Sequence, residues 1–325
     1  MQDTESKVLP RYSFKDVIGA VDPRHLPLEL KDDAGLKVYK QWSAKTKELP
    51  PLCVYHGNCL DGFTAAWAMW LKYPDTEFVA GVYGQDPPKC DGRDVYLLDF
   101  SYKRDVLLSI LEVAKSVTIL DHHKSAELDL QDLPDIDCYG GAAVIFDMQK
   151  SGARLAWEWF HPDKIAPRLI AYVEDRDLWR FALLFTREIS AALFSYDYSF
   201  ETWSVLSGKM QQVGLDSFVT EGAAIERKHH KDIKELLAKT RRLLRIDGTL
   251  VPTANLPYTL ASDAANLLAV DAPFGATYYV DSDGWHQFSL RSREGGADVS
   301  VIALRYGGGG HKHAAGFRVK SLEAL

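Results

Sequence analysis

The chain has 325 residues, of which 46% are hydrophobic and 26% charged, and its formal net charge is −7. This composition is typical of a globular protein and gives no sign of a broad basic surface for long duplex nucleic acid. The length predicts two domains, because a single hydrophobic core rarely grows beyond about 300 residues. No apolar run reaches the roughly 20 residues of a membrane-spanning helix, and the polar N-terminus lacks a secretory signal. A cytoplasmic protein without membrane attachment is therefore expected, in keeping with four cysteines that form no C-x-x-C pair.

The first part of the chain alternates between strand and helix patterns. Residues 1–48 are an N-terminal extension, partly helical over 36–45. The domain expected over 49–220 has strands at 52–55, 77–83, 95–98 and 117–120, and helices at 63–72, 103–114, 143–150 and 152–160. This alternation predicts an α/β fold in which a mostly parallel sheet carries helices on both faces.

The second part of the chain has a different pattern. Residues 221–246 are charged with apolar residues at helical spacing, including Leu243 and Leu244, and predict a connector helix. Short strand patterns then follow in residues 247–325, which are expected to form a smaller C-terminal α/β domain. We expect the active cleft to lie between the two domains.

Histidine and aspartate residues follow three of the predicted strands, in the segments VYHGN, YLLDF and TILDHH. In parallel sheets, ligands bind at the carboxyl ends of the strands. The set of candidate metal-binding and catalytic residues is His56, Asp61, Asp99, Asp121, His122, His123 and Asp175. Imidazole and carboxylate groups together suit Mn²⁺, Co²⁺, Zn²⁺ or Fe²⁺, and two ions sharing a bridging carboxylate can activate a water and bind a phosphoryl group.

A glycine run near the C-terminus, GGGGH, predicts a phosphate-binding loop. Glycines allow a close approach of the backbone to a ligand, and successive N–H groups can form an anion nest. Arg291 lies on a neighbouring predicted strand, and its guanidinium can bind a phosphate through two parallel hydrogen bonds.

At this point the sequence resembles a known family. VTILDHHK is similar to the defining motif of the DHH phosphoesterases, which include RecJ-like exonucleases, nanoRNases, cyclic-dinucleotide phosphodiesterases and family II inorganic pyrophosphatases. VYHGNCLDGFTAAW, YLLDFS and YVEDRDLW resemble its first, second and fourth motifs. QFSLRSREGGADVSVIALRYGGGGHKHAAGF resembles the DHH-associated C-terminal domain, so that the resemblance covers about residues 50–325.

The resemblance implies a role for each matching residue. The metal ligands would be His56, Asp61, Asp99, His122 and Asp175, with Asp99 bridging two ions. Asp177 competes with Asp175, which is preferred because it follows the apolar run directly. Asp121 would orient its neighbours and His123 would face the scissile phosphate. The substrate's terminal phosphate or nucleotide would be held by Arg291, Gly308, Gly309, Gly310 and His311.

The first motif departs from the family pattern at one position. The family has two aspartates separated by one residue, and the first of them is replaced here by Cys59. A thiolate at this position could bind a soft metal such as zinc or iron. The alternative interpretation is a small buried residue beside a more weakly held ion.

These observations predict a hydrolase that uses two divalent ions, with Mn²⁺ the first choice and Co²⁺, Mg²⁺, Zn²⁺ or Fe²⁺ as alternatives. Its expected substrates are short single-stranded RNA or DNA, or dinucleotides, cleaved to nucleoside 5′-monophosphates, because a second domain would limit substrate length. The alternatives are a phosphodiesterase or phosphatase for linear or cyclic signalling dinucleotides, a single-strand DNA exonuclease and a non-catalytic nucleotide-binding regulator. Oligomeric state is left open, with a homodimer as one option.

Overall fold

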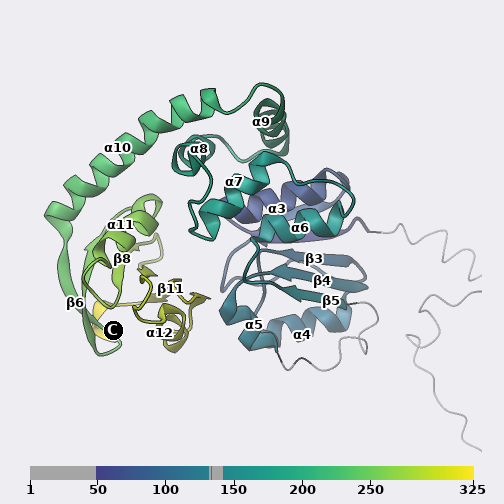
Figure 1. Cartoon of the computed structure of the whole chain (residues 1–325). Coiled ribbons are helices and arrows are strands. Elements are labelled where there is room, and N and C mark those ends of the chain that lie inside the picture. Colours follow the sequence, from purple (N-terminus) through teal and green to yellow (C-terminus); the bar gives the residue numbers. More distant parts are fainter. Residues whose placement is uncertain (1–48, 132, 134–141) are drawn as a thin grey trace, which may run out of the picture. The chain divides into compact units, whose positions relative to one another are not determined.

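The computed structural model describes residues 49–131, 133 and 142–325 (Figure 1). The N-terminal extension with its expected helix, and Cys138, lie outside the described residues. Residues Pro50–Leu325 form one compact unit, which contains two β-sheets.

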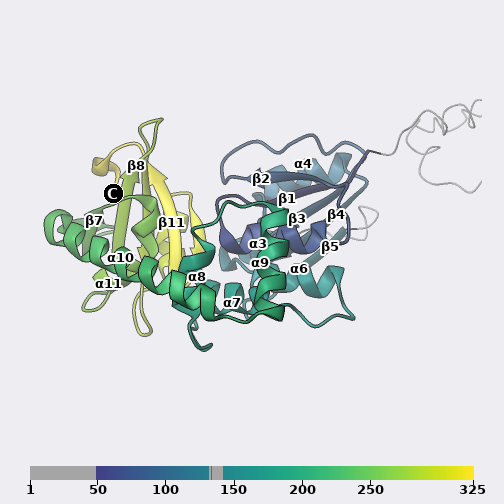
Figure 2. The same ribbon diagram turned by 90° about the horizontal axis from the view of Figure 1, so that it is seen from above.

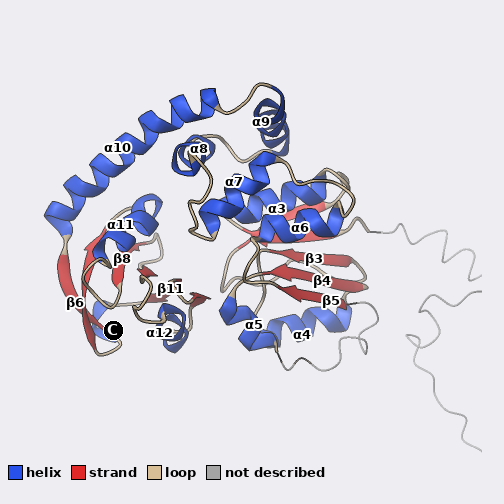
Figure 3. Cartoon of the chain, viewed as in Figure 1, coloured by secondary structure: helices blue, strands red, loops and turns tan. Residues whose placement is uncertain are grey.

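The first sheet has five parallel strands in the order β2-β1-β3-β4-β5. They are β1 (Leu52–His56), β2 (Glu77–Gly81), β3 (Asp94–Leu98), β4 (Ser116–Asp121) and β5 (Ala142–Phe146). Helices α3 (Leu60–Trp70) and α6 (Gly152–Phe160) cover one face, and α4 (Arg104–Val113) and α5 (Lys124–Leu130) lie on the other (Figures 1 and 3). This arrangement confirms the predicted parallel sheet with helices on both faces.

The strands divide their side chains between two cores. Cys53 and Leu120 pack with the aromatic residues of α3 and α6, whereas their neighbours Val54 and Ile119 pack against α4. Successive residues of a strand point to opposite faces, and here both faces are apolar because helices cover both. The predicted helix over 143–150 is wrong. Its short apolar run, AAVIF, pairs with β4 as the edge strand β5, because five residues including a β-branched pair suit a strand better than a helix.

Four further helices follow the first sheet. They are α7 (Arg168–Asp177), α8 (Thr186–Leu193), α9 (Phe200–Gln212) and α10 (Asp216–Thr240), the last of which is the expected connector (Figure 2). The connector begins and ends earlier than predicted. Leu243 and Leu244 lie in the strand β6 (Arg242–Ile246), which pairs with the next strand, so that ladder formation overrides the helical spacing of the leucines. Among the described residues, no helix is long and apolar enough to span a bilayer.

The second sheet has the order β10-β11-β9-β8-β7-β6 and is mixed. Its remaining strands are β7 (Thr249–Asn255), β8 (Gly275–Val280), β9 (His286–Arg291), β10 (Gly309–His311) and β11 (Ala314–Val319). It carries the helices α11 (Ala261–Leu268) and α12 (Val299–Arg305) and the short 3₁₀ turns η4 (Tyr258–Leu260) and η5 (Leu322–Ala324). Phe274, Leu290 and Phe317 belong to its separate core, as expected for a smaller C-terminal α/β domain.

Candidate metal centre and cleft

The carboxyl ends of β1, β3 and β4 bring the predicted ligands together. Asp99 follows β3 with a left-handed backbone (φ 54°), and its amide donates to the carbonyl oxygen of Leu120 at 2.9 Å. Its carboxylate reaches Nε2 of His122 at 3.0 Å and Nδ1 of His56 at 3.3 Å. The carboxylate of Asp99 is thus shared between histidines from two strand ends, as a bridging ligand would be.

Asp61 of the first motif lies in α3 and is held by hydrogen bonds from the start of α6. The Asp61 carboxylate accepts hydrogen bonds from the amides of Gly152 at 2.6 Å and Ala153 at 3.0 Å, in the first turn of α6. Free amides and the helix dipole favour a negative charge at this end of a helix. Gly62 is required in the same motif, because a Cβ there would overlap the carbonyl oxygen of His56.

Asp121 is fully buried and fixes the orientation of its neighbour. It accepts hydrogen bonds from the amide of His122 at 2.7 Å and from the hydroxyl of Ser101 at 2.6 Å. Nδ1 of His123 lies 2.7 Å from the same carboxylate. This pairing assigns the proton to Nδ1 and leaves Nε2 as the nitrogen that can face a ligand. The predicted orienting role of Asp121 fits this geometry.

The fourth motif contributes Asp177 to the cluster and not Asp175. Asp177 Oδ2 lies 3.5 Å from Nε2 of His122. The Asp175 carboxylate accepts hydrogen bonds from Thr186 Oγ1 at 2.5 Å and from the amide of Ala182 at 2.9 Å, and thereby holds the connection between α7 and α8. We therefore replace Asp175 by Asp177 as the expected ligand. The apolar run before Asp175 could not decide between the two aspartates. Both lie in α7, where residues two positions apart point to different sides of the helix.

The electrostatics show an excess of negative charge in this cluster. Burial and the nearby carboxylates of Asp177 and Asp99 raise the pKa of Asp61 well above its usual range. Burial would lower the pKa of His122, but its hydrogen bond to Asp99 and the surrounding carboxylates outweigh burial and raise that pKa to about 10. Repelling carboxylates beside charged histidines are typical of a site that cations would neutralise.

Cys59 lies at the edge of this cluster. Its Sγ is 3.5 Å from Asp99 Oδ2, and burial together with the adjacent carboxylates raises the pKa of the thiol well above its usual range. A protonated thiol that donates to Asp99 fits the interpretation of a small buried residue better than that of a thiolate ligand.

The donor set could hold divalent metal ions. Ligand atoms lie within 4.8 Å of one another in three groups, which are His56, Asp99 and His123, then Asp61, Asp99 and His122, then His122, His123 and His311. Asp99 belongs to two of these groups. Buried Nδ1 of His122 also has no hydrogen-bond partner within the described part of the chain. Mixed imidazole and carboxylate donors suit a transition metal such as Mn²⁺.

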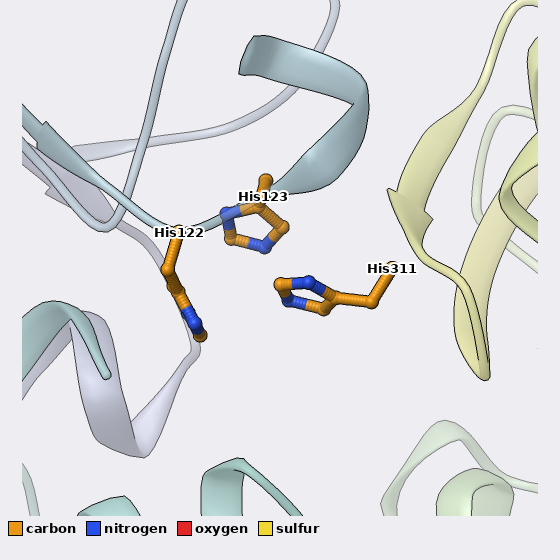
Figure 4. A group of neighbouring side chains, drawn as sticks. All are labelled: His122, His123 and His311. Carbon is orange, nitrogen blue, oxygen red and sulfur yellow. The ribbon is translucent and has the colours of Figure 1, made fainter. Parts of the chain in front are cut away.

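The cluster of candidate ligands opens into a cleft of about 1450 Å³ that both sheets line. His311, from β10, stacks on His123 with ring centroids 4.6 Å apart, and Figure 4 shows it pointing toward His122 and His123. Burial and the charges of these two histidines lower the pKa of His311 to about 2, so its ring is neutral. Beside His311, the amide of Gly310 donates to Ser125 Oγ in α5 at 2.9 Å.

The glycine run lines the cleft but does not form the predicted anion nest. The amide of Gly308 donates to the carbonyl oxygen of Ala303 at 2.9 Å, and that of Gly310 is bound to Ser125. These glycines serve close packing, because a Cβ at Gly308 would overlap the carbonyl oxygen of Gly316. The amides of Gly308 and Gly310 therefore have protein acceptors and are not free for a phosphate.

Arg291 lines the cleft as predicted, at the end of β9. Its Nη2 donates to Ser262 Oγ at 2.7 Å, which fixes the guanidinium. Sequence reasoning missed other residues of the cleft, among them Tyr83, Arg176 and Arg187. Arg176 stands between the two aspartates of the fourth motif, which was a usable signal, whereas Arg187 lies in a helix without a motif.

Comparisons with known proteins found a viral relative and several solved structures. No family model matches the chain. The uncharacterized protein R106 of Acanthamoeba polyphaga mimivirus is 28% identical over 304 residues, which cover 85% of this chain and 69% of that protein. The DHH domain of a member of the s1p family of ribosomal proteins has a TM-score of 0.50 at 12% identity, covering 82% of each chain. RecJ from Thermus thermophilus, in complex with Mn²⁺, has a TM-score of 0.45 at 15% identity and covers 89% of this chain and 52% of its own. The chain has the α/β fold of the DHH family, as its motifs predicted.

Proposed function

We propose that this chain is a metal-dependent phosphodiesterase that hydrolyses short single-stranded oligonucleotides or dinucleotides to nucleoside 5′-monophosphates. The observation that carries the proposal is the position of Asp99, whose carboxylate is shared by two groups of imidazole and carboxylate donors at the strand ends. The ions would be held by His56, Asp61, Asp99, His122 and Asp177. When bound, two such ions supply Lewis-acid activation of a water and offset charge on the phosphate.

The protein's own residues would orient the substrate. His123, oriented by Asp121, can face a ligand through Nε2, and Arg291 adds a fixed positive charge in the same cleft. The Arg291 guanidinium would stabilise charge that develops on the phosphate. The preference for short substrates rests on the second sheet, which lines the same cleft as the candidate ligands and would limit the length of a bound strand.

The test is a time course with 5′-labelled RNAs of two to about ten nucleotides, in Mn²⁺ and in Mg²⁺, beside a linear and a cyclic dinucleotide. Asp99→Asn is the control for a contaminating nuclease, since it retains the shape of the side chain. We expect the shortest RNAs to disappear fastest and the variant to be inactive. Faster loss of long single strands or of the cyclic dinucleotide would overturn the substrate assignment. Survival of every substrate in both metals would favour a nucleotide-binding regulator.

A further inference from the structure

An exposed aromatic ring lies beside the candidate metal centre. Tyr83 follows β2 and lines the cleft, and 47% of its surface is exposed. Its ring packs against the fully buried Phe100 with centroids 4.7 Å apart, and it meets the ring of His56 edge-on at 5.4 Å. The ring is thus supported from inside the protein and open to the cleft. Exposed aromatic rings of this kind are the surfaces on which proteins stack the bases of single-stranded nucleic acid.

A guanidinium from the second sheet lies next to this ring. Arg318, in β11, also lines the cleft, and a Cβ at Gly84 would lie 2.9 Å from its Nη2. Gly84 is the chain neighbour of Tyr83, so the guanidinium reaches the loop that carries the ring. Within the described part of the chain, Arg318 makes no ion pair and no side-chain hydrogen bond. Its N–H donors are therefore available to a ligand.

The ring of Trp285 restrains this guanidinium. Arg318 lies over the ring at 4.7 Å, and the ammonium group of Lys320 lies over the same ring at 4.1 Å. The cation–π contact limits the positions of the Arg318 side chain, whose N–H donors form a rigid planar fork. Lys320 lies outside the residues that line the cleft. Of the two cations on Trp285, Arg318 is therefore the one that a ligand in the cleft would meet.

Arg318 lies apart from the guanidinium of Arg291. In the ladder between β9 and β11, Arg318 pairs with Gln287, whereas Arg291 pairs with Ala314. Positions 287 and 291 lie on the same face of β9 and about 13 Å apart, because a strand rises about 3.3 Å per residue. A group bound at Arg318 is therefore distinct from a phosphate bound at Arg291.

We propose that Tyr83 and Arg318 form a binding site for one nucleobase of the substrate and that this site favours guanine. The inference rests on the proposed function and deepens it by naming a base preference. The base would stack on Tyr83 and turn its edge toward Arg318. Guanine offers two acceptors, O6 and N7, to the paired donors of a guanidinium, whereas adenine carries an amino donor at the position of O6. Adenine would stack as well as guanine but would place this donor against those of Arg318.

The first test measures binding without catalysis. Guanosine and adenosine 5′-monophosphates, which lack a phosphodiester bond, are titrated calorimetrically in Mn²⁺ and in EDTA into wild type, Arg318→Gln and Lys320→Gln. Lys320 is the matched control, because its cation contacts the same ring outside the cleft. We expect wild type and Lys320→Gln to bind the guanosine nucleotide at least about fivefold more tightly, and Arg318→Gln to bind both nucleotides alike.

Three results of this titration would overturn the base site. They are equal affinities of wild type for the two nucleotides, absence of binding in both conditions, and an Arg318→Gln variant that still prefers guanosine monophosphate. If Arg318→Gln weakens both nucleotides by the same factor, the residue contacts the phosphate and not the base.

The second test follows cleavage of the dinucleotides ApG, GpA and ApA in Mn²⁺. One guanine site predicts that wild type has a kcat/KM at least about fivefold higher for either ApG or GpA than for ApA. Equal values for all three would contradict the preference. If none of the dinucleotides is cleaved, the proposed function fails, and the titration still decides on the base site.

The stacking role of Tyr83 is tested with the same dinucleotides. Tyr83→Ala should lower kcat/KM for all three by at least about fivefold, mainly through KM, because every base loses its stacking partner. Tyr83→Phe keeps an aromatic ring and should restore most of the loss. A Tyr83→Phe variant as impaired as Tyr83→Ala would contradict stacking and assign the effect to the hydroxyl group. Thermal melting of each variant confirms that it is folded.

Discussion

Asp177 Oδ2 lies 3.5 Å from Nε2 of His122, although the two residues come from a helix and a strand end 55 positions apart in the chain. Asp175 lies two residues earlier in the chain. Its carboxylate instead accepts hydrogen bonds from Thr186 Oγ1 and from the backbone amide of Leu183, which follows α7. In the last turn of α7, the carboxylate of Asp177 can thus bind a cation, whereas that of Asp175 holds the loop after the helix. Substitutions of the two residues should therefore have different effects.

Asp177→Asn should reduce catalytic activity at least about 100-fold and weaken Mn²⁺ binding, with little change in stability, because it removes a partly exposed ligand charge. Asp175→Asn should lower the free energy of unfolding by about 1–3 kcal/mol, because it weakens three hydrogen bonds that are buried or partly buried. Calorimetric Mn²⁺ titration and urea denaturation distinguish the two. The reverse pattern would restore Asp175 as the ligand.

Mn²⁺ should raise the melting temperature of the wild-type protein, since a ligand that binds only the folded state stabilises it. At a concentration 100 times the dissociation constant, the gain is about 2.7 kcal/mol. Asp99→Asn should lose most of this gain because Asp99 is shared between two donor groups. Differential scanning fluorimetry with and without EDTA measures the effect. A gain of the same size in Asp99→Asn would argue against a metal at the strand ends.

Ser101→Ala should lower kcat by roughly 10-fold, because orienting partners of site residues typically matter by this order. Ser101 Oγ donates to Asp121 at 2.6 Å, and Asp121 in turn fixes the ring of His123. Substrate KM should change little, since Ser101 acts through its neighbours. Ser109→Ala, on the exposed surface of α4, is the control. A rise in KM alone would assign Ser101 to substrate binding.

Gly62→Ala should destabilise the protein and weaken metal binding together, because the added Cβ would push against the His56 carbonyl and displace a candidate ligand. Gly208→Ala is the matched control. Gly208 lies in α9 with open space around its Cβ position, and alanine there should stabilise the helix by about 0.5–1 kcal/mol. Circular dichroism during urea denaturation gives the free energy of unfolding of each variant. A Gly62→Ala variant as stable as wild type would contradict the packing argument.

Asp263 should contribute to the pH dependence of stability. Burial acts to raise the pKa of its carboxyl, but the hydrogen bond to His229 and the charges of Arg176 and Arg187 lower it overall. A lowered folded-state pKa gives stability that is present above the unfolded-state pKa of about 3.9 and is lost as pH falls further. Compared with wild type, Asp263→Asn should therefore lose less stability between pH 5 and about 3. Parallel unfolding curves of the two proteins would contradict this expectation.

The parallel sheet could be predicted from the sequence, and so could the strand ends where the candidate ligands lie, because apolar runs ending in His or Asp are local patterns. His56, Asp99 and His122 were predicted from strand ends that a parallel sheet necessarily brings to one edge. The chain also signalled the second α/β domain and the connector helix, through changes in the period of its apolar residues.

Several features of the fold and the candidate site depend on tertiary contacts and could not be predicted from local patterns. Residues 142–146 form a strand because they pair with β4. Leu243 and Leu244 lie in a strand and not in the connector helix because they pair with β7. Asp177 replaced Asp175 because rotation along α7 sets which carboxylate faces His122. The glycine amides are bonded because Ala303 and Ser125 lie beside them. Arg187 lines the cleft because of the way its helix packs, and no motif in its own segment indicates this position. Each outcome depends on a partner distant in the chain, and spacing along one segment carries no information about such a partner.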